Sequence, residues 1–343
     1  MPWDGGDKML AINQLFVDAV ESATKGVDLF AALQKAIELE HATVPPYLVA
    51  AYSLKGANTA IRNIILDIVR EEMLHMAIVC NLLTALGSKA NIAGADFVPK
   101  YPSSLPMGIQ GQLQVGLAKF SPELVRDVFM KIEEPETPLH FPMDAGAPEF
   151  STIGAFYQAL MAKIDELGDA AFIAPVERQV FGAATGFPET RLFPITNVQT
   201  ALAALDALVS DGEGTTTSPL DSTKQLAHYY RFAAIFHGKE LVPDAAVPEG
   251  YAYRGAALPF DPAEVFDFPA NPKVADHAPG SVPRQAMEAF NRRYSAVLRD
   301  LDATFGGRPE LMAPTMAKMV QLRGPAAAAI SRNVGVSFEY MPP

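Results

Sequence analysis

Two ionisable side chains interrupt an otherwise apolar pattern in the first third of the chain. The pattern is made by residues spaced alternately four and three apart: Ile61, Ile65, Ile68, Glu72, His75, Val79, Leu82 and Leu86. This spacing places all of them on one face of a helix that packs against other helices. Burying a carboxylate and an imidazole costs on the order of several kcal/mol unless each has a partner. A metal ion would be a partner for both, so Glu72 and His75 are candidate ligands.

A second carboxylate falls on the buried face of the preceding segment. Glu40 shares one helical face with apolar residues on both sides, which are Leu33, Ala36, Ile37, Val44, Tyr47, Leu48 and Ala51. A carboxylate from one helix and Glu-x-x-His from the next are half of the ligand set of ferritin-like di-iron bundles. The other half must come from later helices. His228 is the fourth candidate, because it shares a predicted helical face with Gln225, Phe232 and Ile235.

The elements that position these residues are predicted to be helices of an all-α, ferritin-like four-helix bundle. The expected bundle helices cover residues 28–55, 58–86, 151–168 and 219–241. Pro45 and Pro46 should kink or interrupt the first of them. Residues 88–120 are rich in Gly and Pro and predict the long crossover of such bundles, followed by short helices near 121–133 and 197–210.

The chain is expected to divide into three parts. Residues 1–27 hold an N-terminal helix over 7–25, residues 28–242 form the bundle, and residues 243–343 form a Pro-rich arm and C-terminal helices that pack on it. The arm is predicted to be extended because prolines recur from Pro243 to Pro283, while Tyr251, Phe260 and Phe268 give it apolar area with which to dock.

Composition narrows the classes of function. The 343 residues carry 39 acids against 27 bases, a net charge of −12, which argues against binding nucleic acid or anionic membranes. The start of the chain lacks a signal-peptide pattern, and no apolar run approaches the roughly 18 residues that span a bilayer. Cys80 is the single cysteine, expected to be buried and unreactive. We therefore expect a cytoplasmic protein that acts on a small molecule, and a homo-oligomer is compatible with this sequence.

Two stretches resemble a known family. AIELEHATVPPYL followed by IVREEMLHMAIVCNLLTALG is similar to the ferritin-like domain of the iminophenyl-pyruvate dimer synthases, which include synthases of the violacein and rebeccamycin pathways. The resemblance continues through TIGAFYQAL and LAHYYRFAAIFHGKEL and covers about residues 28–340. It implies iron or another divalent ion in the middle of a four-helix bundle. For some members it also implies oxidative coupling of two imine molecules derived from an aromatic amino acid.

Two departures from the family pattern concern the metal ligands. Ala155 stands where many relatives carry Glu, and Gln225 stands where a second Glu-x-x-His would place its Glu. The ligand set that the resemblance implies is therefore Glu40, Glu72, His75 and His228, with Gln225 as a neutral oxygen donor. Two carboxylates offset the charge of one divalent cation, which favours one ion over two. Mixed carboxylate and imidazole ligands favour iron, although zinc and manganese accept similar sets.

Other ionisable residues near these motifs have less specific interpretations. The run that contains Glu133, Glu134 and Glu136 is expected to be a solvated face, and Glu71 is expected to support the ligands through Arg70 or Arg62. Three functions remain open: a metal-dependent oxidoreductase, an imine-coupling enzyme of secondary metabolism that hardly needs metal, and a degenerate bundle with a binding or structural role.

Overall fold

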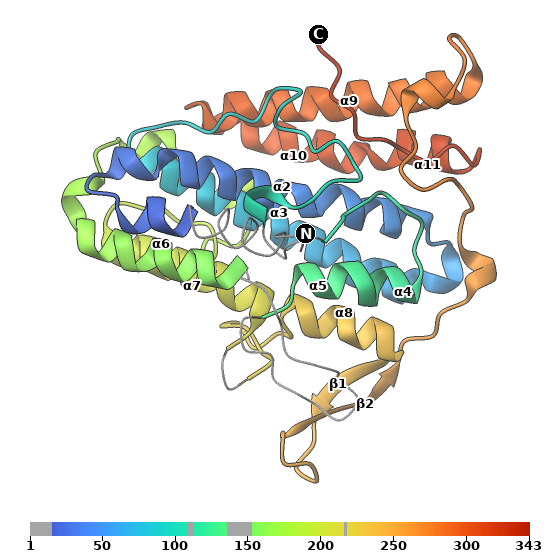
Figure 1. Ribbon diagram of the computed structural model, residues 1–343, viewed down its shortest axis with the longest axis horizontal. Helices are drawn as coiled ribbons and strands as arrows, with labels where there is room; N and C mark the ends of the chain where they lie inside the picture. The colour runs from blue at the N-terminus through green and yellow to red at the C-terminus, as the bar shows by residue number, and fades with distance from the viewer. Residues whose placement is uncertain (1–15, 109–112, 136–152, 216–217) are drawn as a thin grey trace, which may run out of the picture.

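Two long helices joined by a short connection form the centre of the structure (Figure 1). The computed structural model describes residues 16–108, 113–135, 153–215 and 218–343. Helices α2 (Phe30–Ser53) and α3 (Thr59–Ala85) pack along their length, and both are apolar on most of their circumference. The predicted all-α, ferritin-like bundle is confirmed, and these two helices match the expected ranges closely.

The remaining elements surround this pair. In Figure 1, α9, α10 and α11 lie on one side of α2 and α3, and the helices from α4 to α8 lie on the other. Their bounds are α4 (Pro122–Leu124), α5 (Met130–Ile132), α6 (Ile153–Leu167), α7 (Val198–Glu213), α8 (His228–His237), α9 (Val282–Phe305), α10 (Met312–Gln321) and α11 (Arg323–Ile330). A π-helical turn over Val125–Phe129 joins α4 to α5, so 122–132 form one continuous helix. The Ser121 hydroxyl caps its start by accepting from the Leu124 N–H at 3.1 Å.

Helix α2 is not interrupted at Pro45 and Pro46. Each proline lacks an N–H, which leaves the carbonyl four residues earlier without its helical donor. For Pro46 that carbonyl belongs to Ala42, and the Tyr101 hydroxyl donates to it at 2.9 Å. A residue of the long crossover thus replaces the missing bond, and the helix runs on past Glu40.

The helix expected over 219–241 is much shorter in the structure. Residues before His228 form a turn, in which Oδ1 of Asp221 accepts from the N–H groups of Thr223 and Gln225 at 2.7 and 2.9 Å. Lys224 has a left-handed φ of 67°, which no helix interior accepts. Helix α8 therefore begins at His228 and ends at His237, and the next residue, Gly238, is also left-handed.

The Pro-rich arm begins with a hairpin that sequence periodicity did not indicate. Strands β1 (Lys239–Pro243) and β2 (Tyr251–Ala257) pair antiparallel beyond the end of α8. The rest of the arm is extended, as expected, and Asn58 anchors it: its side-chain amide donates to the carbonyls of Asp261 and Glu264, each at 2.9 Å. Of the helix expected over 7–25, residues 16–21 are helical, and residues 1–15 lie outside the described part.

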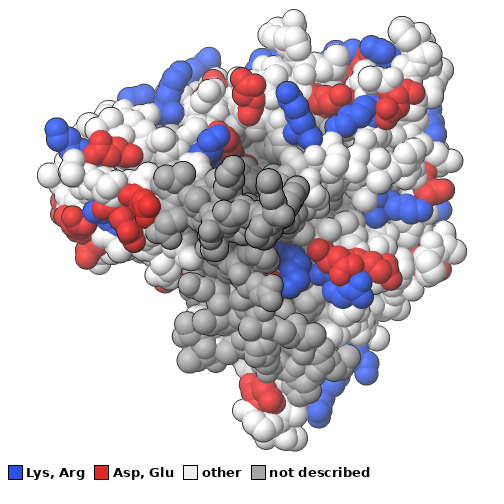
Figure 2. Space-filling model, in the orientation of Figure 1, with Lys and Arg blue, Asp and Glu red and all other residues white. Residues whose placement is uncertain are grey.

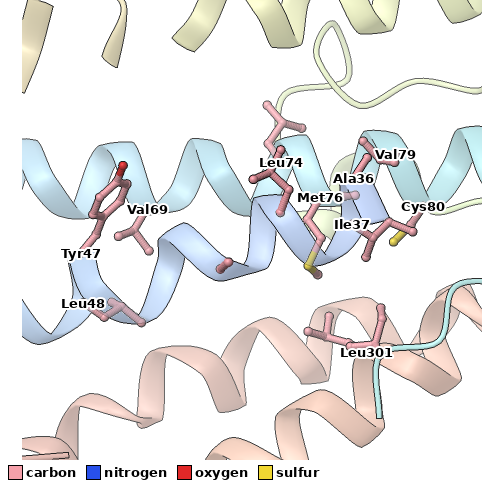
Figure 3. Close-up of a cluster of buried hydrophobic side chains, with 14 of the residues drawn as sticks. Ala36, Ile37, Tyr47, Leu48, Val69, Leu74, Met76, Val79, Cys80 and Leu301 are labelled. Carbon is pink, nitrogen blue, oxygen red and sulfur yellow. The ribbon is translucent and has the colours of Figure 1, made fainter. Parts of the chain in front are cut away.

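The core between α2, α3 and α9 is closely filled. Figure 3 shows Cys80 and Ile37 in the same cluster as Leu301 of α9. The Cys80 side chain has no exposed surface, and burial raises the pKa of its thiol well above the usual value. The prediction that Cys80 is buried is confirmed.

The outer surface carries charges of both signs. On the face in Figure 2, acidic and basic side chains lie interspersed among uncharged residues. Among the described residues, none of the helices combines the length and apolar character needed to cross a membrane.

Candidate metal centre

Five buried side chains from four parts of the chain converge inside the bundle. Glu40 comes from α2, Glu72 and His75 from α3, His228 from the first position of α8, and Glu133 from the position after α5. They form two groups that share Glu72: Glu40 with Glu72 and His75, and Glu133 with Glu72 and His228. Within each group the candidate donor atoms all lie within 4.8 Å of one another.

Both imidazoles direct the same ring nitrogen toward these carboxylates. Nδ1 of His75 lies 3.6 Å from Oε2 of Glu40 and 3.7 Å from Oε1 of Glu72. Nδ1 of His228 lies 2.8 Å from the same Glu72 oxygen and 3.5 Å from Oε2 of Glu133. Glu72 therefore stands between two nearly equivalent sets of donors.

The other nitrogen of each ring faces a further carboxylate, which an arginine holds. Nε2 of His75 lies 3.1 Å from Oδ2 of Asp211, and Asp211 also accepts from Arg191. A carboxylate held by an arginine acts as an acceptor, so it favours the tautomer with the proton on Nε2 and the lone pair on Nδ1.

His228 has the same support on its own side of the centre. Its Nε2 lies 2.8 Å from Oε2 of Glu71, and Arg231 donates to the same carboxylate. Although burial opposes ionisation of Glu71, the hydrogen bond from His228 and the charge of Arg231 lower its pKa to about 2. Both histidines are therefore oriented with Nδ1 toward the carboxylates of the centre, where it could bind a cation in place of a proton.

The residues fit a divalent metal ion. Nδ1 of His228 is buried and makes no hydrogen bond, because the nearby Glu72 oxygen lies at a suitable distance but not in hydrogen-bond geometry. A buried imidazole nitrogen that faces carboxylate oxygens needs either a proton or a metal cation between them. Carboxylate and imidazole are ligands that iron, zinc and manganese accept.

Hydroxyl groups orient the three carboxylates. Tyr47 donates to Oε1 of Glu133 at 2.6 Å, and Tyr157 of α6 donates to Oε1 of Glu40. The Thr43 hydroxyl lies 2.8 Å from Oε2 of Glu72. One oxygen of Glu133 and one of Glu40 are thus each held by a tyrosine hydroxyl, which leaves the second oxygen of each for a metal ion.

Without metal, protons must balance the charges in this centre. Burial, with the charge of Glu133 next in size, raises the pKa of Glu72 to about 7. Burial disfavours a charge on His75, yet hydrogen bonds with Asp211 and Glu40 outweigh it and raise the pKa of His75 to about 10. For His228, the neighbouring carboxylates of Glu133 and Glu71 likewise outweigh burial and place the pKa well above its usual value. The ligands therefore hold protons that a metal ion would displace.

The structure brings four of the five sequence-predicted ligands together and leaves one apart. Glu40, Glu72, His75 and His228 meet as described, and their role as ligands stays a prediction. Gln225 does not join them: it lies exposed in the turn before α8, and its amide donates to Thr223 at 3.3 Å. It was placed at the centre by the helix expected over 219–241, which does not extend to this residue.

The interpretation of Glu133 as part of a solvated face is wrong. Glu133 and Glu134 are each only 6% exposed, while Glu136 lies outside the described residues. A signal was present in the sequence, because Val125, Phe129 and Glu133 are spaced four apart and the first two are fully buried. With Glu133 the centre has three carboxylates, so the argument for a single ion from two carboxylates no longer holds.

The supporting residues also differ from expectation. Glu71 does face a ligand, but its partners are His228 and Arg231; Arg70 bonds the carbonyl of Gly186 and Arg62 that of Leu54. Sequence reasoning missed Asp211 and Arg191, which lie far along the chain from His75. Helix α6 contributes the Tyr157 hydroxyl, which donates to Glu40.

Comparisons with known proteins agree with this architecture. The family model described as Ferritin-like matches residues 33–237, which include every residue of the centre. A crystal structure of a ferritin-like protein from Caulobacter vibrioides is similar in fold, with a TM-score of 0.63 and 22% identity over 91% of this chain and 97% of that one. No curated protein matches the sequence significantly. Because the family model covers more than half of the chain, this protein belongs to the Ferritin-like family.

Proposed function

We propose that the chain is a metal-dependent oxidoreductase whose centre holds two divalent ions, with iron favoured over zinc or manganese. The observation that carries the proposal is the pair of three-residue groups that share Glu72, each with a histidine Nδ1 turned inward. Three carboxylates and two neutral imidazoles supply three negative charges, which offset most of the charge of two divalent cations. Mixed carboxylate and imidazole donors suit iron.

The protein residues around the centre would hold the ligands and control protons. Asp211 and Glu71 fix the histidine tautomers, and Tyr47 and Tyr157 fix the outer carboxylates. Burial of all five candidate ligands to 6% exposure or less keeps bulk water from competing for the ions. Iron bound there would supply one-electron redox chemistry with dioxygen.

We further propose that the reaction belongs to secondary metabolism and consumes a small imine derived from an amino acid. Support comes from the sequence resemblance to iminophenyl-pyruvate dimer synthases in the segments that carry Glu40, Glu72 and His75. This substrate is proposed on resemblance, because a fold by itself hosts many chemistries.

The test uses protein loaded with iron and an imine generated in place from an aromatic amino acid by an added oxidase, with catalase present. We expect the mass of a coupled dimer in the products, and its loss with His228→Ala. Product that persists after chelation would mean that the metal is dispensable. Bound metal without product would leave a metal-binding protein, and neither metal nor product would indicate a degenerate bundle.

A further inference from the structure

A small pocket lies beside the centre and reaches four of its five candidate ligands. Glu40, Glu72, His75 and Glu133 line it on one side. Its other walls include the apolar residues Ile132, Ile153, Leu208 and Val209 and the glycines Gly154 and Gly212. The volume is about 30 Å³. One water molecule needs about 10–15 Å³ on this scale, so the pocket has room for roughly two or three groups of that size.

The wall of the pocket next to Glu133 contains Gly212. Gly212 lies in the last turn of α7, is partly exposed, and a Cβ atom built on it would lie 3.7 Å from Oε2 of Glu133. At Gly212, therefore, only the space that one side chain would fill separates the surface of the molecule from the centre. Any larger residue would project toward Glu133.

The backbone at this position does not require glycine. Gly214, which ends the helix, has a left-handed φ of 77°, but Gly212 keeps a helical conformation. A glycine inside a helix destabilises it relative to alanine. Among the described residues near Gly212, the one atom that a Cβ would meet within 4 Å is the Glu133 oxygen, at an ordinary contact distance. The missing side chain is therefore explained by the pocket and not by local folding.

We propose that Gly212 is the size filter of the metal centre, and that it leaves space for an uncharged ligand of about two or three heavy atoms to reach Glu133 and its neighbours. The inference rests on the proposed metal-dependent function and deepens it by restricting which molecules meet the ions. The three carboxylates that line the pocket repel an anion, and the apolar walls offer it no partner for the hydration that it would lose. An aromatic imine is too large for this volume, so its coupling would take place outside the pocket.

Two variants and one matched control test the filter. Gly212→Ala adds a methyl group at contact distance and should fold normally, with a melting temperature equal to or above that of the unmodified protein. Gly212→Val fills more of the pocket. Gly324→Ala makes the same change in helix α11, where a Cβ would meet no atom within 4 Å.

The first measurement needs no metal. Xenon is uncharged and binds apolar space in proteins, which the apolar walls of this pocket supply, so xenon NMR of the metal-free protein reports whether that space is open. We expect Gly212→Ala to weaken xenon binding by about tenfold and Gly212→Val to abolish it, while Gly324→Ala leaves it unchanged. Equal xenon binding by the unmodified protein and the three variants would show that Gly212 does not control the size of the pocket, and would overturn the proposal.

The second measurement uses protein loaded with ferrous iron and nitric oxide, an uncharged ligand of two heavy atoms. At equal iron content, Gly212→Ala should slow nitric oxide binding by about tenfold, and Gly212→Val should slow it further. Equal rates at equal iron content would overturn the filter and leave the metal function standing. If the unmodified protein holds no iron, the metal function fails, and the xenon result alone decides whether Gly212 controls the pocket.

Discussion

The imidazole rings of His75 and His228 stack with their centroids 5.4 Å apart and their planes inclined by 25°. They come from α3 and α8, and each turns Nδ1 toward Glu72 and Nε2 toward a carboxylate of its own. The centre therefore has two similar halves that meet at one carboxylate. These two halves are the residues that would hold the two proposed ions.

Glu133→Gln should weaken metal binding in one half of the centre and leave the other half intact. The substitution keeps the shape of the side chain but removes the charge from the half that contains His228, so the protein should bind about one ion fewer per chain. Metal analysis after dialysis measures this directly. Glu134→Gln is the matched control, because Glu134 is equally buried but pairs with Lys131 at 3.1 Å. Unchanged metal content in Glu133→Gln would remove Glu133 from the ligand set.

Asp211→Asn should weaken metal binding without removing a ligand. An amide can donate to Nε2 of His75, which would favour the tautomer with a proton on Nδ1 and oppose metal binding there. Loss of such a supporting group typically costs about 10–100-fold in metal affinity. Competition with a chromophoric chelator gives the affinity. Asp206→Asn, at an exposed position of the same helix, should leave it unchanged, and equal affinities for both variants would disprove the role of Asp211.

Stability of the metal-free protein should fall as the pH rises. The pKa of Glu72 is raised from 4.5 to about 7 in the folded state. The contribution of Glu72 to the free energy of unfolding is therefore fully present below pH 4.5 and is lost as the pH rises through about 7. His75 acts in the same direction, since its pKa is raised from 6.5 to about 10. Melting temperatures measured between pH 4.5 and about 10 follow this loss of stability. In Glu72→Gln, the part of the loss that occurs near pH 7 should be absent.

The stabilisation that metal provides should follow the opposite trend. Metal ions bind the deprotonated ligands, so binding must displace protons from Glu72 and His75. The rise in melting temperature on adding zinc should therefore grow with pH. Parallel pH profiles for the metal-free and metal-loaded protein would contradict the assignment of these groups as ligands.

Cys80 should not react in the native protein. Its side chain has no exposed surface, and burial raises the pKa of the thiol, so little of the reactive thiolate is accessible. A thiol reagent should label the protein only after unfolding. Labelling as fast as that of a free thiol would show that the core around α3 opens readily.

The sequence predicted the parts of the centre that lie on long regular helices. In α2 and α3 the apolar spacing extends over many turns, so one helical face is well defined and Glu40, Glu72 and His75 fall on it. His228 lies beside Glu72 as expected even though the predicted helix around it was too long, because Phe232 and Ile235 lie on its C-terminal side, within α8.

The residues that the sequence did not place correctly lie on short elements or reach the centre only through contacts between distant parts of the chain. Glu133 follows a helix with a π-helical turn, and its neighbours in sequence are charged, which hides the buried face marked by Phe129. Asp211 and Arg191 reach His75 only through tertiary packing, which no local pattern records. Gln225 was misplaced because the turn at Asp221 depends on side-chain hydrogen bonds.

The most direct test of the two-ion centre is a titration of metal-free protein with ferrous iron, followed by metal analysis and thermal melting. We predict that the protein binds up to about two ions per chain, and that free metal at about 100 times the dissociation constant stabilises the fold by about 2.7 kcal/mol for each ion bound. This corresponds to a rise in melting temperature of roughly 4 °C for each ion. A protein that binds no iron, zinc or manganese and melts at the same temperature with and without chelator would contradict the account.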